Sequence, residues 1–131
     1  QEGLPVMGTC AGMILLAKKA YDKVIGNKNQ LLLGALDIEI ERNSFGRQYD
    51  SFESELDITG IGSNYKGIFI RAPAVISIGP HVQILSKFDG KIVAVKQDNI
   101  IGTSFHPELS DDYRMHRFFI DLITDWKKTI S

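Results

Sequence analysis

The chain has 131 residues, of which 44% are hydrophobic, and its 15 basic residues nearly balance 16 acidic ones. This length suits one domain, and the apolar content is enough for a core without a disulfide or a metal. The balanced charge indicates no nucleic-acid or membrane-surface partner. No apolar run approaches the ~18 residues needed to cross a bilayer. The single cysteine, Cys10, excludes an internal disulfide and favours a reducing, cytoplasmic setting.

The first third of the chain predicts a strand, a helix, a turn and a second strand. Residues 4–7 form a short apolar run that indicates a buried strand, and residues 11–21 have the apolar spacing of a helix. Residues 26–29 carry turn-forming types, and residues 36–40 alternate as a strand does. Residues 41–53 are too polar and irregular for the core, so we expect a surface loop there.

The remainder of the chain predicts several short strands and a final helix. The β-type runs cover residues 55–58, 67–70, 82–86, 92–96 and 100–104. Asp89-Gly90 favours a hairpin turn, and Asp98-Asn99 favours a second tight turn. After Pro107 the spacing becomes helical, with Ser110 as the expected cap. The apolar side of this helix is predicted to comprise Met115, Phe118, Phe119, Leu122, Ile123 and Trp126. This order of elements favours a three-layer α/β domain with an antiparallel extension.

The pattern Gly8-Thr9-Cys10-Ala11-Gly12 lies between a predicted strand and a predicted helix. It is the nucleophile-elbow pattern with cysteine in place of serine. The glycines would let the chain turn without side-chain clashes, and the helix start is expected to lower the pKa of the thiol. The N–H of Ala11 would then face an oxyanion beside the sulfur. The alternative is a small buried hydrophobic residue, which most free cysteines are.

The second motif, Ser104-Phe105-His106-Pro107-Glu108, follows a predicted strand. His106 could accept the thiol proton, and Glu108 could orient the imidazole. Taken alone, a loop histidine beside an acidic helix start would be the simpler interpretation; together with the elbow, the catalytic interpretation is favoured. His81 has no motif around it and is predicted to be a solvated loop residue, and His116 is predicted to be structural.

These motifs resemble the Cys-His-Glu triad of class I glutamine amidotransferases. The strings ERNSFGRQYDSFE (41–53), FIRAP (69–73) and SFHPEL (104–109) more specifically resemble the glutaminase subunits of pyridoxal 5'-phosphate synthase, and the resemblance extends over about residues 5–119. It implies a three-layer, flavodoxin-like α/β fold with a mixed sheet. It also implies that residues 1–131 belong to a single glutamine amidotransferase domain.

The resemblance assigns roles to seven residues. It implies a triad of Cys10, His106 and Glu108, and glutamine binding through Arg42, Ile70, Arg71 and Ala11. For the two arginines other interpretations stay open: Arg42 could form a surface ion pair with Glu39 or Glu41, and Arg71 could be a charge at a strand end. Composition does not choose between these, whereas the motif match favours glutamine binding.

The resemblance also implies the reaction. L-Glutamine would be hydrolysed to glutamate and ammonia through a cysteine thioester, without a metal or organic cofactor, and the ammonia would pass to a synthase subunit in a hetero-oligomer. The family carries an upstream segment with the first strands and a Gly-Gly-Glu-Ser loop that supplies a second oxyanion donor, and none of the 131 residues matches it. We therefore expect the C-terminal portion of the family domain, with the activity belonging to the full-length protein.

Three other functions compete with this one. The chain could be an inactive fragment, or a non-catalytic module that docks on a synthase through residues 41–53. It could be a class I amidotransferase serving another acceptor, which the ERNSFGRQ and FIRAP strings argue against. It could also be an elbow hydrolase with a cysteine nucleophile, but Arg42 and Arg71 would then face no charged amino-acid substrate.

Overall fold

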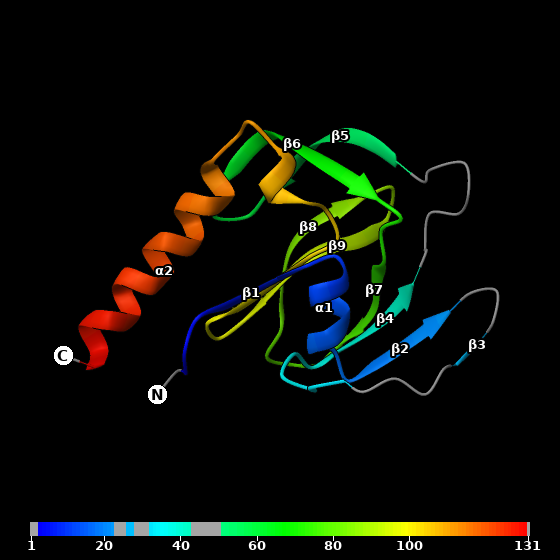
Figure 1. The fold of residues 1–131 in the computed structure, drawn as a ribbon, viewed down its shortest axis with the longest axis horizontal. Helices are drawn as coiled ribbons and strands as arrows, with labels where there is room; N and C mark the ends of the chain where they lie inside the picture. The colour runs from blue at the N-terminus through cyan, green and yellow to red at the C-terminus, as the bar shows by residue number, and fades with distance from the viewer. Residues whose placement is uncertain (1–2, 23–25, 28–31, 43–50, 131) are drawn as a thin grey trace.

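The computed structural model describes residues 3–22, 26–27, 32–42 and 51–130. Figure 1 shows the helices and strands in these ranges, with α2 extending along one side of the molecule, apart from α1. In chain order the elements are β1 (Val6–Thr9), α1 (Ala11–Leu16), β2 (Lys19–Asp22), β3 (Gly26–Asn27), β4 (Ile38–Arg42), β5 (Ser51–Ile58), β6 (Gly62–Ile70), β7 (Ala74–Ile78), β8 (Gln83–Phe88), β9 (Lys91–Gln97), β10 (Ile100–Thr103), the 3-10 turn η2 (Pro107–Leu109) and α2 (Arg114–Ile130).

The described strands form one mixed sheet and one separate hairpin. The sheet follows the order β1-β10-β9-β7-β4-β2-β3, with β8 paired to β9. β1 runs parallel to β10 and β2 runs parallel to β4, whereas the other pairs are antiparallel. Strands β5 and β6 pair with each other outside this sheet. The predicted α/β class with a mixed sheet is confirmed.

The core lies on both faces of the sheet, because successive strand residues point to opposite sides. Ile100 packs with the cluster that contains α1, whereas Ile101 belongs to the cluster under the β5–β6 hairpin. Met115 of α2 is fully buried in the second cluster. The largest side chains buried there are Tyr65, Phe69 and Phe105. The sheet therefore separates α1 on one face from the hairpin and α2 on the other.

The predicted helix over residues 11–21 is wrong in its second half. The helix α1 ends at Leu16, and β2 occupies Lys19–Asp22. The backbone N–H of Lys18 donates to the carbonyl of Ile38, and β2 then pairs in parallel with β4. Pairing with a strand distant in sequence therefore overrides the local helical pattern.

Two predicted loops contain strand residues, and one central strand was not predicted. Of the expected turn at residues 26–29, Gly26–Asn27 is strand β3, and residues 28–29 lie outside the described ranges. The expected loop over residues 41–53 is wrong at its ends, where β4 continues through Arg42 and β5 begins at Ser51. Residues 43–50 lie outside the described part. Strand β7, missed in the sequence, lies between β9 and β4.

The predicted turns and the final helix agree better with the structure. Asp89 and Gly90 have φ of 53° and 78° between β8 and β9, as a tight hairpin requires, and Asp98 has φ of 53° between β9 and β10. All six predicted apolar residues of α2 are buried or half-buried. The expected cap is wrong: Ser110 accepts the N–H of Asp112, whereas Asp112 accepts the N–H of Arg114 at the helix start. In the described residues, no helix is both long and apolar enough to cross a membrane.

Candidate active site

Cys10 lies at the junction between strand β1 and helix α1. Its backbone has φ of 53° and ψ of −108°, a conformation that costs a non-glycine residue free energy and is concentrated at functional sites. The Cys10 N–H donates to the carbonyl of Thr103 at 2.7 Å, which ties the turn to the end of β10. The Cys10 carbonyl accepts the N–H of Ile14 at 3.2 Å and starts the helix. The predicted strand–turn–helix arrangement is present.

Close packing explains one of the two glycines of the elbow. A Cβ at Gly8 would lie 2.6 Å from Leu16 Cδ1 and 2.8 Å from the carbonyl of Gly12, so only glycine lets the helix approach the strand. A Cβ at Gly12 would meet nothing within 4 Å in the described part of the chain. The predicted role in avoiding a clash is confirmed for Gly8, whereas no contact within the described ranges accounts for glycine at position 12.

The resting thiol is less acidic than the sequence predicts. Burial raises the pKa of Cys10, a hydrogen bond from the Ala11 N–H opposes this rise, and the negative charge of Glu108 adds to it. The expected net lowering of the thiol pKa is wrong because the sulfur is half-buried, and burial has the largest effect on its pKa. The Ala11 N–H nevertheless lies beside the sulfur, next to which the oxyanion of a bound substrate would form.

His106 and Glu108 form a direct pair. His106 Nδ1 lies 2.7 Å from Glu108 Oε2. His106 has an extended backbone, with φ of −107° and ψ of 92°, before the turn η2 that begins at Pro107. This is the conformation that a residue before proline favours, and it brings the two side chains together. Burial raises the pKa of Glu108, but the hydrogen bond with His106, a backbone hydrogen bond and the charges of His106 and His116 together outweigh burial, so the pKa of Glu108 is lowered overall.

Strand β6 places the cysteine and the histidine near each other. The thiol of Cys10 donates to the carbonyl of Ile70 at 3.7 Å, and the backbone N–H of His106 donates to the carbonyl of Ile68 at 2.8 Å. Within the described part of the chain, no hydrogen bond joins the sulfur to the His106 ring. The thiol proton is therefore directed to Ile70 in this state, and catalytic hydrogen bonds are often long before substrate binds.

The two predicted glutamine-binding arginines flank one stretch of chain. Glu41 pairs with Ala74, so Arg42 at the end of β4 lies beside the segment that leaves β6. Arg71 opens this segment with φ of 46°, a left-handed conformation, and its side chain is exposed. Ile70, just before it, is 38% exposed. Arg71 thus follows Ile70 directly in the chain, and the backbone of Arg42 lies beside the end of the same segment.

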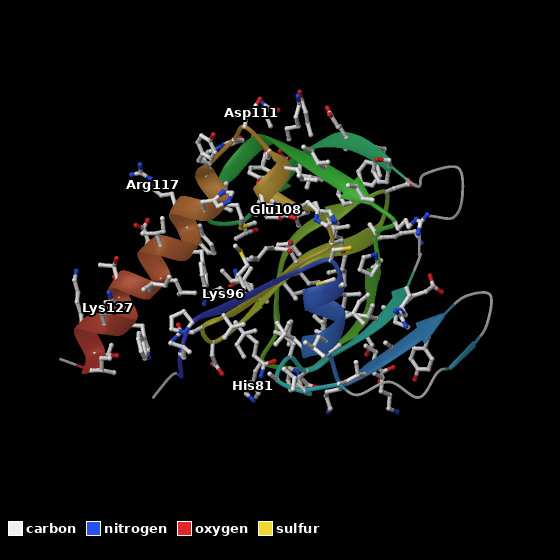
Figure 2. All side chains as sticks on the ribbon, viewed as in Figure 1. His81, Lys96, Glu108, Asp111, Arg117 and Lys127 are labelled. Atoms are coloured by element: carbon white, nitrogen blue, oxygen red, sulfur yellow. The ribbon has the colours of Figure 1, made fainter. Side chains whose placement is uncertain are left out.

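The other histidines lie outside this arrangement. Figure 2 shows the labelled His81 on the opposite side of the view from Glu108, and His81 is exposed in a turn, as predicted. The His116 ring packs edge-on against Tyr113, with ring centroids 6.0 Å apart. Its Nδ1 atom is buried and has no hydrogen-bond partner in the described ranges. The positive charge of His116 also contributes to the lowered pKa of Glu108, an effect that the sequence did not indicate.

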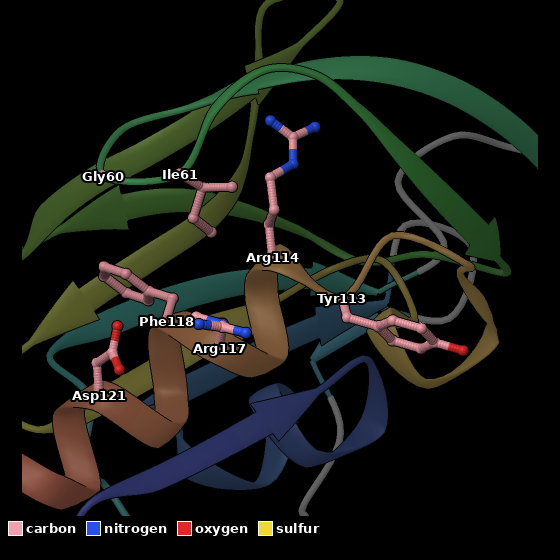
Figure 3. Close-up of a pocket in the computed structure, with 7 residues that line it drawn as sticks. All are labelled: Gly60, Ile61, Tyr113, Arg114, Arg117, Phe118 and Asp121. Atoms are coloured by element: carbon pink, nitrogen blue, oxygen red, sulfur yellow. The ribbon is translucent and has the colours of Figure 1, made fainter.

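A separate pocket of about 340 Å³ lies between the turn of the β5–β6 hairpin and the start of α2 (Figure 3). Ile61 lines it from the hairpin, with Arg114, Arg117 and Phe118 from the helix. None of the predicted catalytic or glutamine-binding residues lines this pocket, so it is not the predicted active site. In the described ranges there is also no group of three or more histidine, cysteine or carboxylate side chains able to hold a metal ion.

The chain is similar to known proteins over nearly its whole length. Residues 1–125 match the model of the SNO glutamine amidotransferase family. The chain is 54% identical to the pyridoxal 5'-phosphate synthase subunit PdxT of Nitrosopumilus maritimus, over 98% of this chain and 63% of that protein. It is 49% identical to the PdxT of Bacillus licheniformis, over 97% of this chain and 62% of that protein. A crystal structure of a glutamine amidotransferase superposes with a TM-score of 0.83 and 44% identity, over 92% of this chain and 61% of the other. The chain thus spans less than two thirds of the length of each relative.

Proposed function

The chain belongs to the SNO glutamine amidotransferase family, and on this premise we propose that the protein hydrolyses L-glutamine to L-glutamate and ammonia with Cys10 as the nucleophile. One observation carries the proposal. The sulfur at the strained strand–helix junction and the backbone of the His106–Glu108 pair are held by carbonyls of the same strand, two residues apart. A nucleophile, a base and a group that orients the base are the parts that acyl transfer through a covalent intermediate requires.

The first half of the proposed reaction forms a thioester. His106 takes the thiol proton, and the sulfur attacks the side-chain amide carbon of glutamine. The N–H of Ala11 stabilises the negative charge that develops on the amide oxygen. His106 then gives its proton to the departing nitrogen, so that ammonia leaves and the glutamyl group stays on Cys10. Glu108 keeps the imidazole oriented throughout.

The second half regenerates the enzyme. His106 removes a proton from water, and the hydroxide attacks the thioester carbon. The oxygen of the collapsing intermediate again faces the Ala11 N–H, and the sulfur leaves with the proton from His106. Glutamate is released. In this proposal the α-carboxylate of glutamine binds the positive charges of Arg42, at the end of β4, and Arg71, next to Ile70 in the chain.

We further propose that the ammonia passes to a pyridoxal 5'-phosphate synthase partner in a hetero-oligomer. The support is the description of the relatives in Nitrosopumilus and Bacillus as subunits of that synthase. The proposal places the reaction in the cytoplasm, because the nucleophile must remain a free thiol. A glutaminase assay with and without the synthase would separate this function from a non-catalytic docking module, which would produce no ammonia in either case.

Replacing the nucleophile tests the proposal directly. Cys10→Ala in the full-length protein should abolish glutamate formation, a loss of more than about 1000-fold, because no other described side chain can form the thioester. Ser86→Ala, which removes a buried hydroxyl from strand β8, should retain activity and serves as the control. A diazo-ketone analogue of glutamine should label the native protein once, at Cys10. Unchanged turnover in Cys10→Ala would rule out this nucleophile.

A further inference from the structure

The free edge of strand β6 is used by three groups of the candidate active site. In the described ranges β6 pairs only with β5, so the backbone carbonyls on its other edge do not bond to another strand and can accept hydrogen bonds from other groups. The carbonyls of alternate residues point the same way, and those of Lys66, Ile68 and Ile70 accept hydrogen bonds from Ser110 Oγ, the His106 N–H and the Cys10 thiol. The first of these three bonds has no role in the proposed reaction so far.

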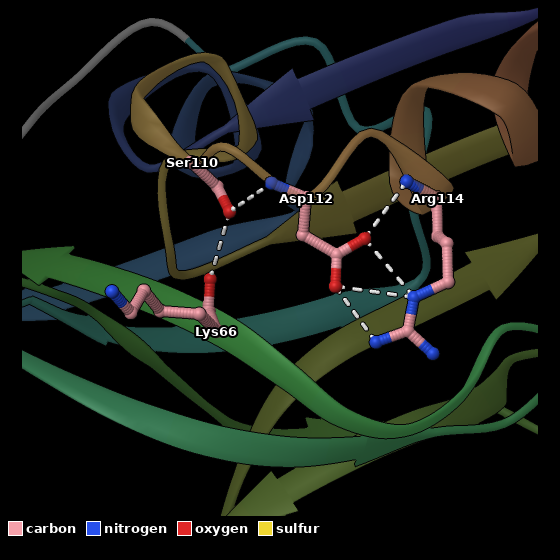
Figure 4. Close-up of polar contacts among 4 residues, drawn as sticks. All are labelled: Lys66, Ser110, Asp112 and Arg114. Atoms are coloured by element: carbon pink, nitrogen blue, oxygen red, sulfur yellow. Dashed lines mark hydrogen bonds and ion pairs between the residues drawn. The ribbon is translucent and has the colours of Figure 1, made fainter.

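Ser110 joins the strand, the turn and the final helix. It is 5% exposed, and its hydroxyl donates to the Lys66 carbonyl at 3.2 Å while accepting the Asp112 N–H at 3.1 Å. The Asp112 carboxylate in turn holds the Arg114 side chain through both oxygens (Figure 4). The Ser110 N–H donates to the carbonyl of Pro107, which closes the turn η2. Ser110 thus closes the turn through its backbone N–H and attaches the end of the turn to strand β6 through its hydroxyl.

The turn that carries Glu108 is attached to β6 on both sides of this residue. Two residues before Glu108, the His106 N–H donates to a β6 carbonyl, and two residues after Glu108, the Ser110 hydroxyl donates to another. The Glu108 side chain itself is 54% exposed, so packing around the carboxylate does not fix its position. Its 2.7 Å contact with His106 therefore depends on how the turn is held.

We propose that Ser110 is a positioning residue that holds Glu108 against His106 by attaching the end of the η2 turn to strand β6. The inference rests on the proposed glutaminase function, because it assigns Ser110 a role in that reaction. Ser110 touches neither the substrate nor the reacting atoms in this mechanism. It acts through the geometry of the His106–Glu108 pair, and small misplacements of such a pair are costly to turnover.

A buried serine elsewhere in the molecule provides a matched control. Ser86 is 4% exposed, and its hydroxyl donates to the Asp57 carbonyl at 2.9 Å. This bond joins β8 to β5, the other strand of the same hairpin. Ser86→Ala and Ser110→Ala therefore each remove a buried hydroxyl that donates to a hairpin carbonyl, although Ser110→Ala also removes the acceptor of the Asp112 N–H. Only the second removes a bond that holds the turn of Glu108.

The experiment compares glutamine turnover in the full-length variants with the synthase present. Ser110→Ala should lower kcat about tenfold and change KM less than about twofold, because the glutamine-binding side chains are elsewhere. Ser110→Thr keeps the hydroxyl and should restore most of kcat. Ser86→Ala should also lower the urea midpoint, because it removes a buried hydrogen bond, but it should leave kcat unchanged. Equal kcat in Ser110→Ala and the native protein, or an equal loss in Ser86→Ala, would overturn the proposal.

A titration that needs no turnover separates this inference from the proposed function. The carboxyl pKa of Glu108, followed by carbon-13 NMR, should rise in Ser110→Ala as the His106 contact loosens, and should not move in Ser86→Ala. An unmoved pKa in Ser110→Ala would contradict the inference even if glutamine is hydrolysed. A native protein that hydrolyses no glutamine would refute the function instead. If Ser110→Ala does not fold, Ser110→Cys replaces it, and native kcat in that variant would equally overturn the inference.

Discussion

The elbow at Cys10 and the turn at His106–Ser110 are positioned by different physical means. The elbow is tied to β10 by the Cys10 N–H, but steric fit determines its shape: φ is positive at Cys10, and Gly8 packs so closely on α1 that no side chain fits. The turn is fixed by hydrogen bonds, from the His106 N–H and the Ser110 hydroxyl, to a strand about forty positions earlier in the chain. The Glu108 carboxylate on it remains 54% exposed.

This difference predicts that the two regions respond differently to substitution. Close packing is intolerant of added volume, so the elbow should lose stability when a single methyl group is added. A hydrogen-bonded turn on the surface contributes little to global stability but sets the orientation of its catalytic groups, so it should lose activity first. Substitutions in each region, with matched controls, test this contrast.

The largest expected effect is a loss of glutamine turnover when the turn at His106–Ser110 loses its carboxylate. Glu108→Gln keeps the shape of the side chain but removes the charge that orients and stabilises the His106 imidazolium, so kcat should fall about 100- to 10,000-fold while glutamine binding changes little. Steady-state glutaminase assays with the synthase present measure both parameters. Glu55→Gln removes the same charge from an exposed position on β5 and should leave kcat unchanged. Native-like kcat in Glu108→Gln would remove Glu108 from the mechanism.

The second largest expected effect is a loss of folding stability when a methyl group is added to the elbow. Gly8→Ala would place a methyl group 2.6 Å from Leu16 Cδ1 and 2.8 Å from the Gly12 backbone, so the free energy of unfolding should fall by about 3 kcal/mol. Gly12→Ala adds the same methyl group inside helix α1, where no described atom lies within 4 Å. Because alanine favours a helix more than glycine does, the free energy of unfolding should rise by up to about 1 kcal/mol. Urea unfolding measures both. If the two variants were equally stable, close packing would not be the reason for glycine at position 8.

The same contrast explains how much the sequence could predict. The elbow depends on residues close together in the chain, so the pattern Gly8 to Gly12 reveals the strand, the turn and the start of the helix. Asp89-Gly90 reveals its hairpin for the same reason, since the turn needs positive φ at adjacent positions. Local chemistry was therefore a sufficient guide for the elbow and the tight turns.

Features that depend on distant pairing were not visible in the sequence. Residues 19–22 continue a helical pattern, yet they form a strand because β4 lies beside them. Strand β7 does carry a β-branched run, AVISI, that indicates a strand, but its place between β9 and β4 depends on distant pairing. The shift of the thiol pKa was predicted in the wrong direction, because the burial of Cys10 depends on the whole fold. Ser110 looked like a helix cap because nothing local points to the Lys66 carbonyl.

The smallest expected effect is the pH dependence of stability, and it has opposite signs in the two regions. The pKa of Glu108 is lowered from its ordinary value of 4.5, so its contribution is present above that pH and is lost as the pH falls through the folded-state pKa. The pKa of Cys10 is raised from 9.0, so its contribution is present below that pH and is lost as the pH rises through the folded-state pKa. Acid should weaken the turn, and alkali should weaken the elbow.

Urea unfolding of the native protein, Glu108→Gln and Cys10→Ala across pH 3 to 11 would measure these two contributions. The stability advantage of the native protein over Glu108→Gln should shrink on acidification below about pH 4.5, by at most about 1 kcal/mol, because the exposed pair is screened by solvent. Cys10→Ala should lose less stability than the native protein above about pH 9, because it has no buried thiol to ionise. If the stability advantage of the native protein over Glu108→Gln grew in acid, the His106–Glu108 contact would not favour the charged carboxylate. The turn would then lack the electrostatic role that distinguishes it from the elbow.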